Sequence, residues 1–295
     1  MIPNKTGTRK NSHVTMLSHS QGRKKNLDNM LFYKTYPHKQ SKEWVVFVHG
    51  AGGSSAIWFK QIRAYKQHFN LLLLDLRGHG KSNTMFQDVM DNQYTFKMVT
   101  KDIIDVLNHL KIESAHFVGM SLGTIIIRHL AELAPERVQT MTLGGAITRL
   151  NTRSQVLISL GNLSKHILPY MWLYRIFAYV VMPQKNQRQS RHLFIREAKK
   201  LCQQEFKRWF KLATDVNPIM KYFKEKELVI PTLYLMGEHD YMFIKSVKEM
   251  IKRHQNSVLT QLSNCGHVCN VEQPEAFNHH SIEFIQLHSQ PPLAH

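Results

Sequence analysis

The sequence predicts an α/β protein with a mostly parallel, twisted sheet that is covered by helices on both faces. Two observations lead to this fold class. Continuous apolar runs of β-forming residues, such as 44–48 and 71–74, are typical of strands that are buried on both faces. These runs alternate with helical patterns of ten residues or more, and such alternation indicates βαβ units and therefore parallel strands.

The predicted elements follow one another in order, with one interruption. The helix at 100–110 rests on apolar residues at positions 103, 104, 107 and 110, and the helix that begins at Leu122 ends before Pro135. Ser54 or Ser55 provides a cap for the first helix. The expected strands are 31–35, 44–48, 71–74, 115–118, 138–143, 231–236 and 258–262. The expected helices are 54–65, 100–110, 122–134, 244–253 and 274–287.

The interruption divides the chain into three parts. Between 147 and 215 no strand pattern occurs, and the helical stretches there are basic and aromatic. We interpret 147–215 as an inserted helical segment that forms a lid over the α/β core, which comprises 30–146 and 216–295. Residues 1–29 are polar and basic, as in a disordered tail. A length of 295 residues suits one large domain with such an insertion.

The net charge of +18 is concentrated in two segments. Residues 1–30 hold six basic groups and one acid, and residues 149–213 hold thirteen basic groups and two acids, Glu197 and Glu205. Such segments are typical of a solvated surface, or of a surface that meets nucleic acid, anionic lipid or acidic substrates. The sequence contains no recognised nucleic-acid-binding module, so we expect no nucleic acid partner. An anionic membrane surface, reached through the basic lid and tail, remains a candidate partner.

Composition also favours a location inside the cell. Three cysteines are too few for a disulfide framework, so a reducing cytoplasm is the simplest compartment. The first thirty residues lack the apolar stretch of a secretory signal. The most apolar region, 156–182, is interrupted by Lys165, Pro169 and Arg175, and is therefore not a spanning helix. It could still lie on a membrane.

The strongest local motif for chemistry is the run GMSLG at 119–123, which stands between a predicted strand and a predicted helix. A serine at such a sharp turn projects its hydroxyl from the sheet edge, and the small residues on either side let strand and helix approach. The amide groups at the start of the following helix favour a developing oxyanion. Ser121 is therefore the candidate nucleophile.

Four further motifs accompany this run, each after a predicted strand. They are HGAGG at 49–53, DLRGHGKS at 75–82, GEHD at 237–240 and CGH at 265–267. With these motifs, in this order, the chain resembles the α/β-hydrolase superfamily, in its lid-bearing, esterase- or lipase-like serine hydrolase branch. The resemblance covers about 31–288 and is weakest in the inserted segment.

The resemblance implies a role for each motif. It implies a catalytic triad of Ser121, Asp240 and His267, and an oxyanion hole that is formed by the backbone amides of Ala51 and Leu122. The motif at 75–82 has a mainly structural role in the family, so we do not expect its Asp75 or His79 to be catalytic. No Gly-Lys-Ser/Thr ending follows the motif at 49–53, which excludes a phosphate-binding loop.

Other residues offer alternative assignments for the triad acid and for a metal site. Asp215 is a second, poorer candidate for the triad acid, because no predicted strand precedes it. Cys265, His267 and Cys269 suggest a metal site, but their spacing is not that of a usual zinc pair and a fourth ligand is lacking. We interpret Glu272 as a surface group. The motifs imply no metal and no cofactor.

The predicted function is hydrolysis of a carboxylic ester, including a lipid ester, through an acyl-serine intermediate. The same triad would serve a thioesterase, a C–C bond hydrolase or an aminopeptidase. A hypothesis of another class is a ligand-sensing protein that keeps the hydrolase fold and turns over slowly. A third is a protein whose basic lid and tail act at a membrane surface. The sequence does not indicate the substrate-binding residues or the oligomeric state.

Overall fold

The computed structural model describes residues 30–83, 93–150, 155–156, 159, 161–163, 168–214 and 216–289. The predicted tail at 1–29 and the alternative acid Asp215 lie outside these residues. Parts of the inserted segment also lie outside them, so its bounds at 147 and 215 stay a prediction.

In the described part of the chain, seven strands form one sheet in the order β1-β3-β2-β4-β5-β6-β7. The edge strand β1 is antiparallel to β3, and every other pair is parallel. This confirms the predicted fold class. The strands are β1 (Tyr33–Tyr36), β2 (Trp44–Val48), β3 (Asn70–Leu74), β4 (Ala115–Met120), β5 (Val138–Gly144), β6 (Thr232–Gly237) and β7 (Ser257–Leu262).

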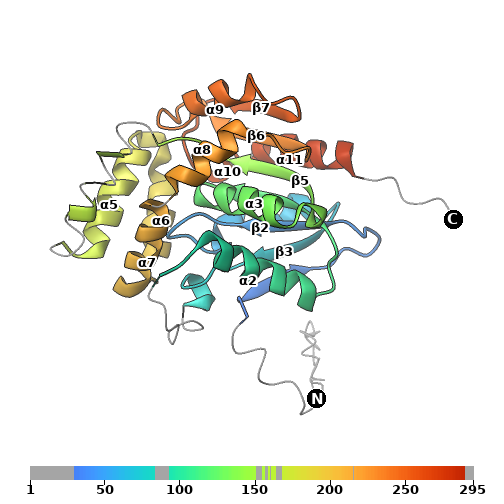
Figure 1. Ribbon diagram of the computed structural model, residues 1–295, viewed down its shortest axis with the longest axis horizontal. Helices are drawn as coiled ribbons and strands as arrows, with labels where there is room; N and C mark the ends of the chain where they lie inside the picture. Colours follow the sequence, from blue (N-terminus) through green and yellow to red (C-terminus); the bar gives the residue numbers. More distant parts are fainter. Residues whose placement is uncertain are drawn as a thin grey trace, which may run out of the picture.

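Two helical layers cover the sheet, as Figure 1 shows. One face packs against α2 (Phe96–His109), α3 (Leu122–Leu133), α8 (Asn217–Glu225) and α9 (Ile244–Ile251). The other face packs against η2 (Ser55–Trp58), α1 (Ile62–Tyr65), α10 (Cys269–Glu272) and α11 (Pro274–His288). Two further 3-10 turns are η3 (Gly80–Ser82) and η4 (Pro135–Arg137). The central strands are buried on both faces, which is why they consist of continuous apolar runs.

The helix predicted at 54–65 is instead two short helices, η2 and α1. At the break, Asn270 donates a buried hydrogen bond to the carbonyl oxygen of Ile57, the acceptor that a continuous α-helix would use for the amide of Gln61. The amide of Gln61 bonds to Trp58 instead. Ser54 caps η2, as one of the two alternatives predicted.

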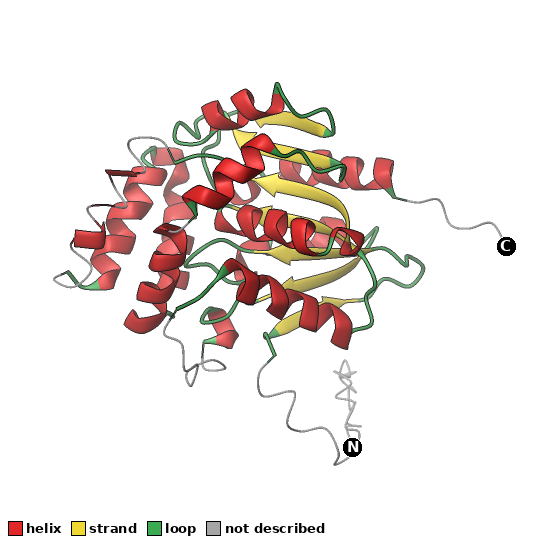
Figure 2. Ribbon diagram, viewed as in Figure 1, coloured by secondary structure: helices red, strands yellow, loops and turns green. Residues whose placement is uncertain are grey.

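The chain between β5 and β6 carries helices beyond the carboxyl ends of the parallel strands (Figures 1 and 2). They are α5 (Tyr170–Val181), the turn η5 (Lys185–Gln187), α6 (Arg188–Ala198) and α7 (Gln203–Thr214). None of the helices in the described ranges is long and apolar enough to cross a membrane.

The only two acids of 149–213 attach these helices to the core. Ser54 donates a hydrogen bond of 2.6 Å to the buried carboxylate of Glu197 on α6. Glu205 on α7 accepts a hydrogen bond of 2.6 Å from Tyr94 and forms an ion pair of 2.6 Å with Arg208. Arg208 belongs to the basic pattern of the inserted segment, yet it is buried because Glu205 neutralises it.

The loop after β3 makes the matching contacts from the core. The indole of Trp209 on α7 donates to the carbonyl oxygen of Arg77 at 3.0 Å. Gly78 has a φ of +70°, and a Cβ atom there would lie 1.9 Å from the carboxylate of Glu205. A residue larger than glycine at 78 would therefore displace the carboxylate of Glu205.

Two buried histidines hold the loops after β2 and β3 together. His79 accepts a hydrogen bond from the amide of Gly52 at 2.9 Å, and His49 accepts one from the amide of Leu76 at 3.0 Å. The other ring nitrogen of each faces a carbonyl oxygen, at Arg77 and Gly50. Each ring is therefore a neutral tautomer with one donor and one acceptor. Burial lowers the pKa of both His49 and His79.

We expect the protein to lose stability in mild acid because of these histidines. The unfolded chain binds protons near pH ~6.5, whereas the lowered pKa values keep the folded rings neutral to lower pH. Their contribution to stability is complete above about pH 6.5 and is lost as the pH falls from there toward the lowered values. Urea unfolding between about pH 8 and about pH 5 measures this loss, at ~1.4 kcal/mol per unit of pKa difference. His79→Gln should flatten the profile, whereas His109→Gln, at an exposed position, should not. A free energy of unfolding that is constant over this range would contradict the prediction.

Removing Glu205 should destabilise the attachment of α7. In Glu205→Ala the buried guanidinium of Arg208 loses its carboxylate, and such a change costs about 3–5 kcal/mol. Chemical denaturation measures the loss. The double variant Glu205→Ala, Arg208→Met should regain part of it because no unpaired charge remains. A double variant that loses the sum of both single effects would show that the pair contributes no coupling.

Candidate active site

Ser121 occupies the turn between β4 and α3 in a strained backbone conformation. Its φ is +54° and its ψ is −123°, in the left-handed region that few residues other than glycine adopt. The amide of Ser121 donates to the carbonyl oxygen of Gly144 at 3.0 Å, and the amide of Thr124 donates to the carbonyl oxygen of Ser121 at 2.9 Å. These bonds hold the turn from both sides, so the serine side chain stands at the carboxyl edge of the sheet.

The two glycines of the motif are required by close packing. A Cβ atom at Gly123 would lie 2.3 Å from the carbonyl oxygen of Val48, and one at Gly119 would lie 2.5 Å from the side chain of Ile127. Strand β2 therefore passes directly beneath the start of α3. This approach also places the loop after β2 next to the serine, since a Cβ atom at Gly50 would be 3.0 Å from that of Ser121.

The structure brings Ser121, His267 and Asp240 into one hydrogen-bonded chain. Nε2 of His267 lies 2.9 Å from Oγ of Ser121, and Nδ1 lies 2.9 Å from Oδ2 of Asp240. The carboxylate can only accept, so Nδ1 carries the ring proton and Nε2 is left to accept from the serine hydroxyl. His267 and Asp240 are buried, and Ser121 is partly exposed.

Backbone contacts between the loops after β6 and β7 bring Asp240 and His267 together. After β6 and β7, the amide of Glu238 donates to Leu262 and the amide of His239 donates to Cys265, both at 2.9 Å. Asp240 and His267 follow immediately on the two joined loops. Sequence alone shows each residue at a strand end, and the pairing of β6 with β7 sets their separation.

The predicted oxyanion-hole residues face the same site. Ala51 and Leu122 both line the cavity beside Ser121. Leu122 is the first residue of α3, so its amide has no acceptor within the helix. Neither amide has a hydrogen-bond acceptor elsewhere among the residues that the structure describes. Both N–H groups are therefore available to a ligand.

The cavity has a volume of about 420 Å³ and an almost entirely apolar lining. The core contributes Ile125, Met242 and Phe243, and the inserted helices contribute residues such as Phe194 and Trp209. None of the described lining residues carries a charge. An uncharged, apolar group fits this space best.

The residues around His267 have structural roles that the sequence did not fully indicate. Burial raises the pKa of the Cys265 thiol to about 12 and also raises that of Cys269, so both thiols are protonated. They donate to the carbonyl oxygens of Leu262 and Leu235, each at 3.4 Å, rather than converging with His267. Glu272 is not simply a surface group: its carboxylate accepts from the amide of Gly266 at 2.6 Å and thereby fixes the loop that carries His267.

Asp75 and His79 have the structural role that the resemblance implies. The Asp75 carboxylate accepts from the amides of Ser55 and Lys81, at 2.7 and 2.9 Å. Neither Asp75 nor His79 belongs to the hydrogen-bonded chain that contains Ser121.

Sequence reasoning did not find the cavity lining or the anchoring acids. The lining comes from several separate segments, and no single motif identifies it. Glu197 and Glu205 did carry a signal, because they are isolated acids in a strongly basic stretch.

Comparison with known sequences finds a match to one family model and several related hydrolases. Residues 43–171 match the family model described as alpha/beta hydrolase fold. 3-Oxoadipate enol-lactonase 1 of Acinetobacter baylyi is 26% identical over 79% of this chain and 85% of its own length. The carboxylesterase YbfK of Bacillus subtilis is 24% identical over 82% of this chain and 79% of its own length.

Solved structures share the fold. A hydrolase from Pseudomonas aeruginosa superposes with a TM-score of 0.74 and 23% identity, covering 86% of this chain and 94% of that one. The enol-lactonase from Burkholderia xenovorans superposes with a TM-score of 0.71 and 20% identity, covering 87% and 96%. The sheet order, the serine turn and these similarities together show that this chain has the α/β-hydrolase fold.

Proposed function

We propose that this protein is a serine hydrolase that cleaves carboxylic esters with an apolar acyl or alcohol group. The observation that carries the proposal is the chain Ser121–His267–Asp240, with two hydrogen bonds of 2.9 Å, at the mouth of an uncharged cavity. Relatives whose names denote ester or lactone hydrolysis support the reaction type.

In the proposed mechanism, His267 acts first as a base. Its Nε2 takes the proton from Ser121 as the serine oxygen attacks the ester carbonyl. The buried carboxylate of Asp240 holds the ring tautomer and stabilises the imidazolium ion that forms. His267 then donates the proton to the leaving alcohol. A water molecule, activated by the same nitrogen, releases the acid from Ser121.

The amides of Ala51 and Leu122 would stabilise the tetrahedral oxyanion in both steps. Backbone donors that are already fixed need no reorganisation when charge develops, which makes them effective in a site shielded from water. The hydrogen bonds that His79 and His49 accept from the amides of Gly52 and Leu76 fix the loop that carries Ala51. The position of this amide therefore depends on the buried histidines.

The substrate class follows from the lining of the cavity. A charged lactone or carboxylate would lose its hydration without gaining a charged partner among the described lining residues. We therefore propose neutral esters rather than charged metabolites. The three cysteines are free, which supports the cytoplasm as the proposed location.

Ser121→Ala should abolish both turnover and covalent labelling by a fluorophosphonate probe, because the attacking oxygen is removed. Asp240→Asn should lower kcat about 10⁴-fold, because the amide favours the wrong tautomer of His267. Stopped assays with aryl esters and in-gel fluorescence measure the two effects. Labelling of Ser121→Ala at the wild-type rate would refute the nucleophile, and labelling of wild type without turnover of any ester would favour a ligand-sensing protein.

Ala213→Phe should shorten the preferred acyl chain. Ala213 lies on α7 and lines the cavity, so a phenyl group there would occupy space that the acyl chain needs. We expect kcat/KM for long-chain aryl esters to fall about 10- to 200-fold, while that for the acetate ester stays nearly constant. The acetate ester serves as the internal control for folding. Equal losses for both substrates would place the acyl chain elsewhere.

A further inference from the structure

The outer surface of α5 and α6 combines features that are rare on a protein surface facing only water. Helix α5 is apolar on two sides. One side, with Tyr174, Ala178 and Val181, is buried against the rest of the protein. The other side exposes Trp172 by 60% and Tyr179 by 59%, whereas Ile176, exposed by 45%, also lines the cavity.

Trp172 and Tyr179 lie on one face of α5. They stand at positions i and i+7, which share one helix face. Exposed tryptophan and tyrosine on one helix face are typical of helices that lie at a membrane interface. Within the described residues, no other tryptophan is as exposed as Trp172, because Trp58 and Trp209 are buried and Trp44 is half-buried.

The neighbouring helix α6 supplies positive charge. The two helices run side by side: Tyr174 and Phe177 of α5 contact Phe194 of α6, with ring centroids 5.5 and 6.0 Å apart. Basic side chains are exposed along α6 and at its end, and one more is exposed on α5. They are Arg175, Arg188, His192, Arg196, Lys199 and Lys200.

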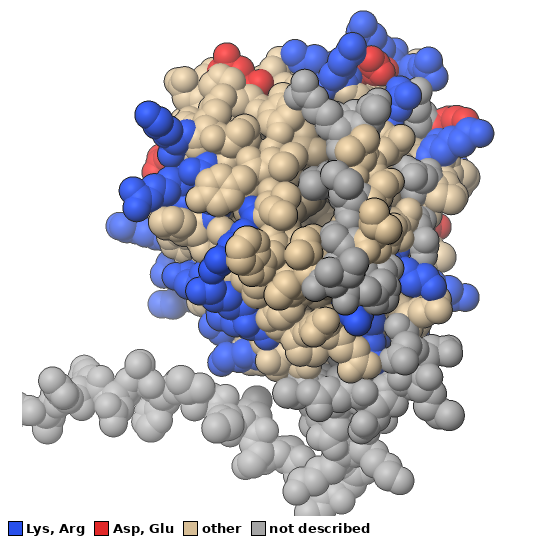
Figure 3. Space-filling view, turned by 90° about the vertical axis from the view of Figure 1, so that its left-hand side faces the viewer, with Lys and Arg blue, Asp and Glu red and all other residues tan. Residues whose placement is uncertain are grey.

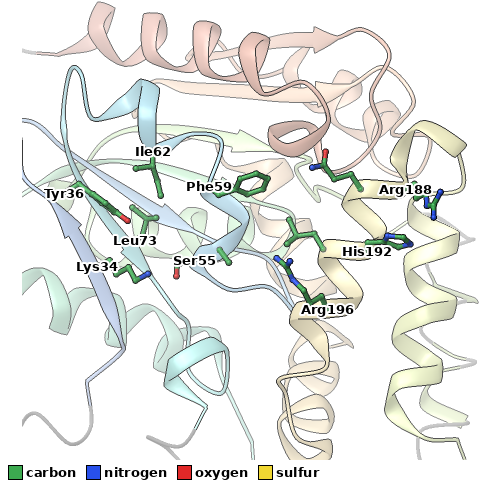
Figure 4. Close-up of a pocket in the computed structure, with 12 residues that line it drawn as sticks. Lys34, Tyr36, Ser55, Phe59, Ile62, Leu73, Arg188, His192 and Arg196 are labelled. Atoms are coloured by element: carbon green, nitrogen blue, oxygen red, sulfur yellow. The ribbon is translucent and has the colours of Figure 1, made fainter. Parts of the chain in front are cut away.

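Figure 4 shows Arg188, His192 and Arg196 following one another along the same helix, beside a groove of about 990 Å³. Across the groove lie Lys34 and the half-exposed Phe59. The groove thus repeats the combination of basic and apolar groups that α5 and α6 present.

Acidic groups are almost absent from this surface. No Asp or Glu occurs between 137 and 196, and Glu197 is buried and bonded to Ser54 and Lys200. Figure 3 views this end of the molecule: Lys and Arg are most numerous along the left-hand side of a broad uncharged area, further Lys and Arg lie at its upper and right-hand margins, and the Asp and Glu in view lie toward the margins. Glu197 pairs with Arg196 and Lys200, so the charges of Arg175, Arg188 and Lys199 are the ones that no acid neutralises among the described residues.

We propose that the outer surface of α5 and α6 docks on an anionic lipid bilayer. The cations would contact the lipid headgroups, and Trp172 and Tyr179 would enter the headgroup region. Both features point to a membrane rather than to a soluble polyanion, because a polyanion would leave Trp172 and Tyr179 in water. The proposal does not depend on the hydrolase activity, since binding can be measured with Ser121→Ala.

The test uses the full chain, as wild type and as Ser121→Ala, and co-sedimentation with vesicles. We expect both proteins to bind vesicles of phosphatidylcholine and phosphatidylglycerol, and to bind pure phosphatidylcholine vesicles at least about tenfold more weakly. Salt near ~1 M should weaken binding to the anionic vesicles, because it screens the charges. Absence of binding to the anionic vesicles would overturn the proposal.

A matched pair of variants separates this surface from net charge alone. The surface variant carries Arg175→Glu, Arg188→Glu and Lys199→Glu. The control carries Lys97→Glu on α2, Lys248→Glu on α9 and Lys252→Glu directly after α9, all at exposed positions. Both change the net charge equally. The surface variant should bind on the order of 100-fold more weakly, and the control within about threefold of wild type. Equal losses would show that total charge, including that of 1–29, drives binding.

Trp172 gives a direct signal of insertion. Its fluorescence emission should shift to shorter wavelength on addition of anionic vesicles, and Trp172→Ala should lose the shift and bind about 5- to 10-fold more weakly. Unfolding midpoints and turnover of the acetate ester confirm that the variants fold. If Trp172→Ala binds like wild type and single-stranded DNA displaces the vesicles, the surface binds polyanions and the membrane proposal is wrong.

Discussion

The sharp turn at Ser121 is the constraint from which the rest of the site follows. A positive φ at a residue with a side chain costs energy, and the turn persists because strand β4, helix α3 and strand β2 are packed without space for any alternative. Gly119 and Gly123 make that packing feasible. The same close approach carries the loop after β2 to the serine, so the nucleophile and the amide of Ala51 are positioned by one packing arrangement.

A second layer of buried polar contacts supports this arrangement from outside. His49 and His79 tie the loops after β2 and β3 together as neutral rings, and Glu197 and Trp209 attach the inserted helices to those loops through Ser54 and Arg77. In a basic segment, an acid that is buried and bonded to the core fixes where the segment sits. The cavity depends on this attachment because α5, α6 and α7 form much of its wall.

The inserted helices therefore have two different surfaces. Toward Ser121 they are apolar and enclose an uncharged cavity, and away from it they expose aromatic residues beside cations. Leu173 and Phe177 of α5 line the cavity while Trp172 and Tyr179 face outward. One helix thus separates the proposed site of chemistry from the proposed lipid surface by the width of a single layer.

Much of the fold was determined by sequence patterns that act locally. The apolar runs of the buried strands, the cap at Ser54 and the stop at Pro135 each reflect a preference of a short segment, so the strands agree with prediction to within a few residues. The helix predicted at 54–65 is divided in two at the point where Asn270, more than two hundred residues away, bonds to the carbonyl group of Ile57. A long-range contact of this kind leaves no trace in a local pattern.

The identities of Ser121, Asp240 and His267 could be proposed from the sequence, because each stands in a distinctive turn directly after a predicted strand. Their separations could not, because these depend on the pairing of β6 with β7 and on the hydrogen bonds between the following loops. The lining of the cavity and the roles of Glu197, Glu205 and Glu272 likewise emerged only from the tertiary structure. Sequence determines which chemical groups are present and which turns carry them, while packing between distant segments decides which groups meet, since a contact depends on two surfaces at once.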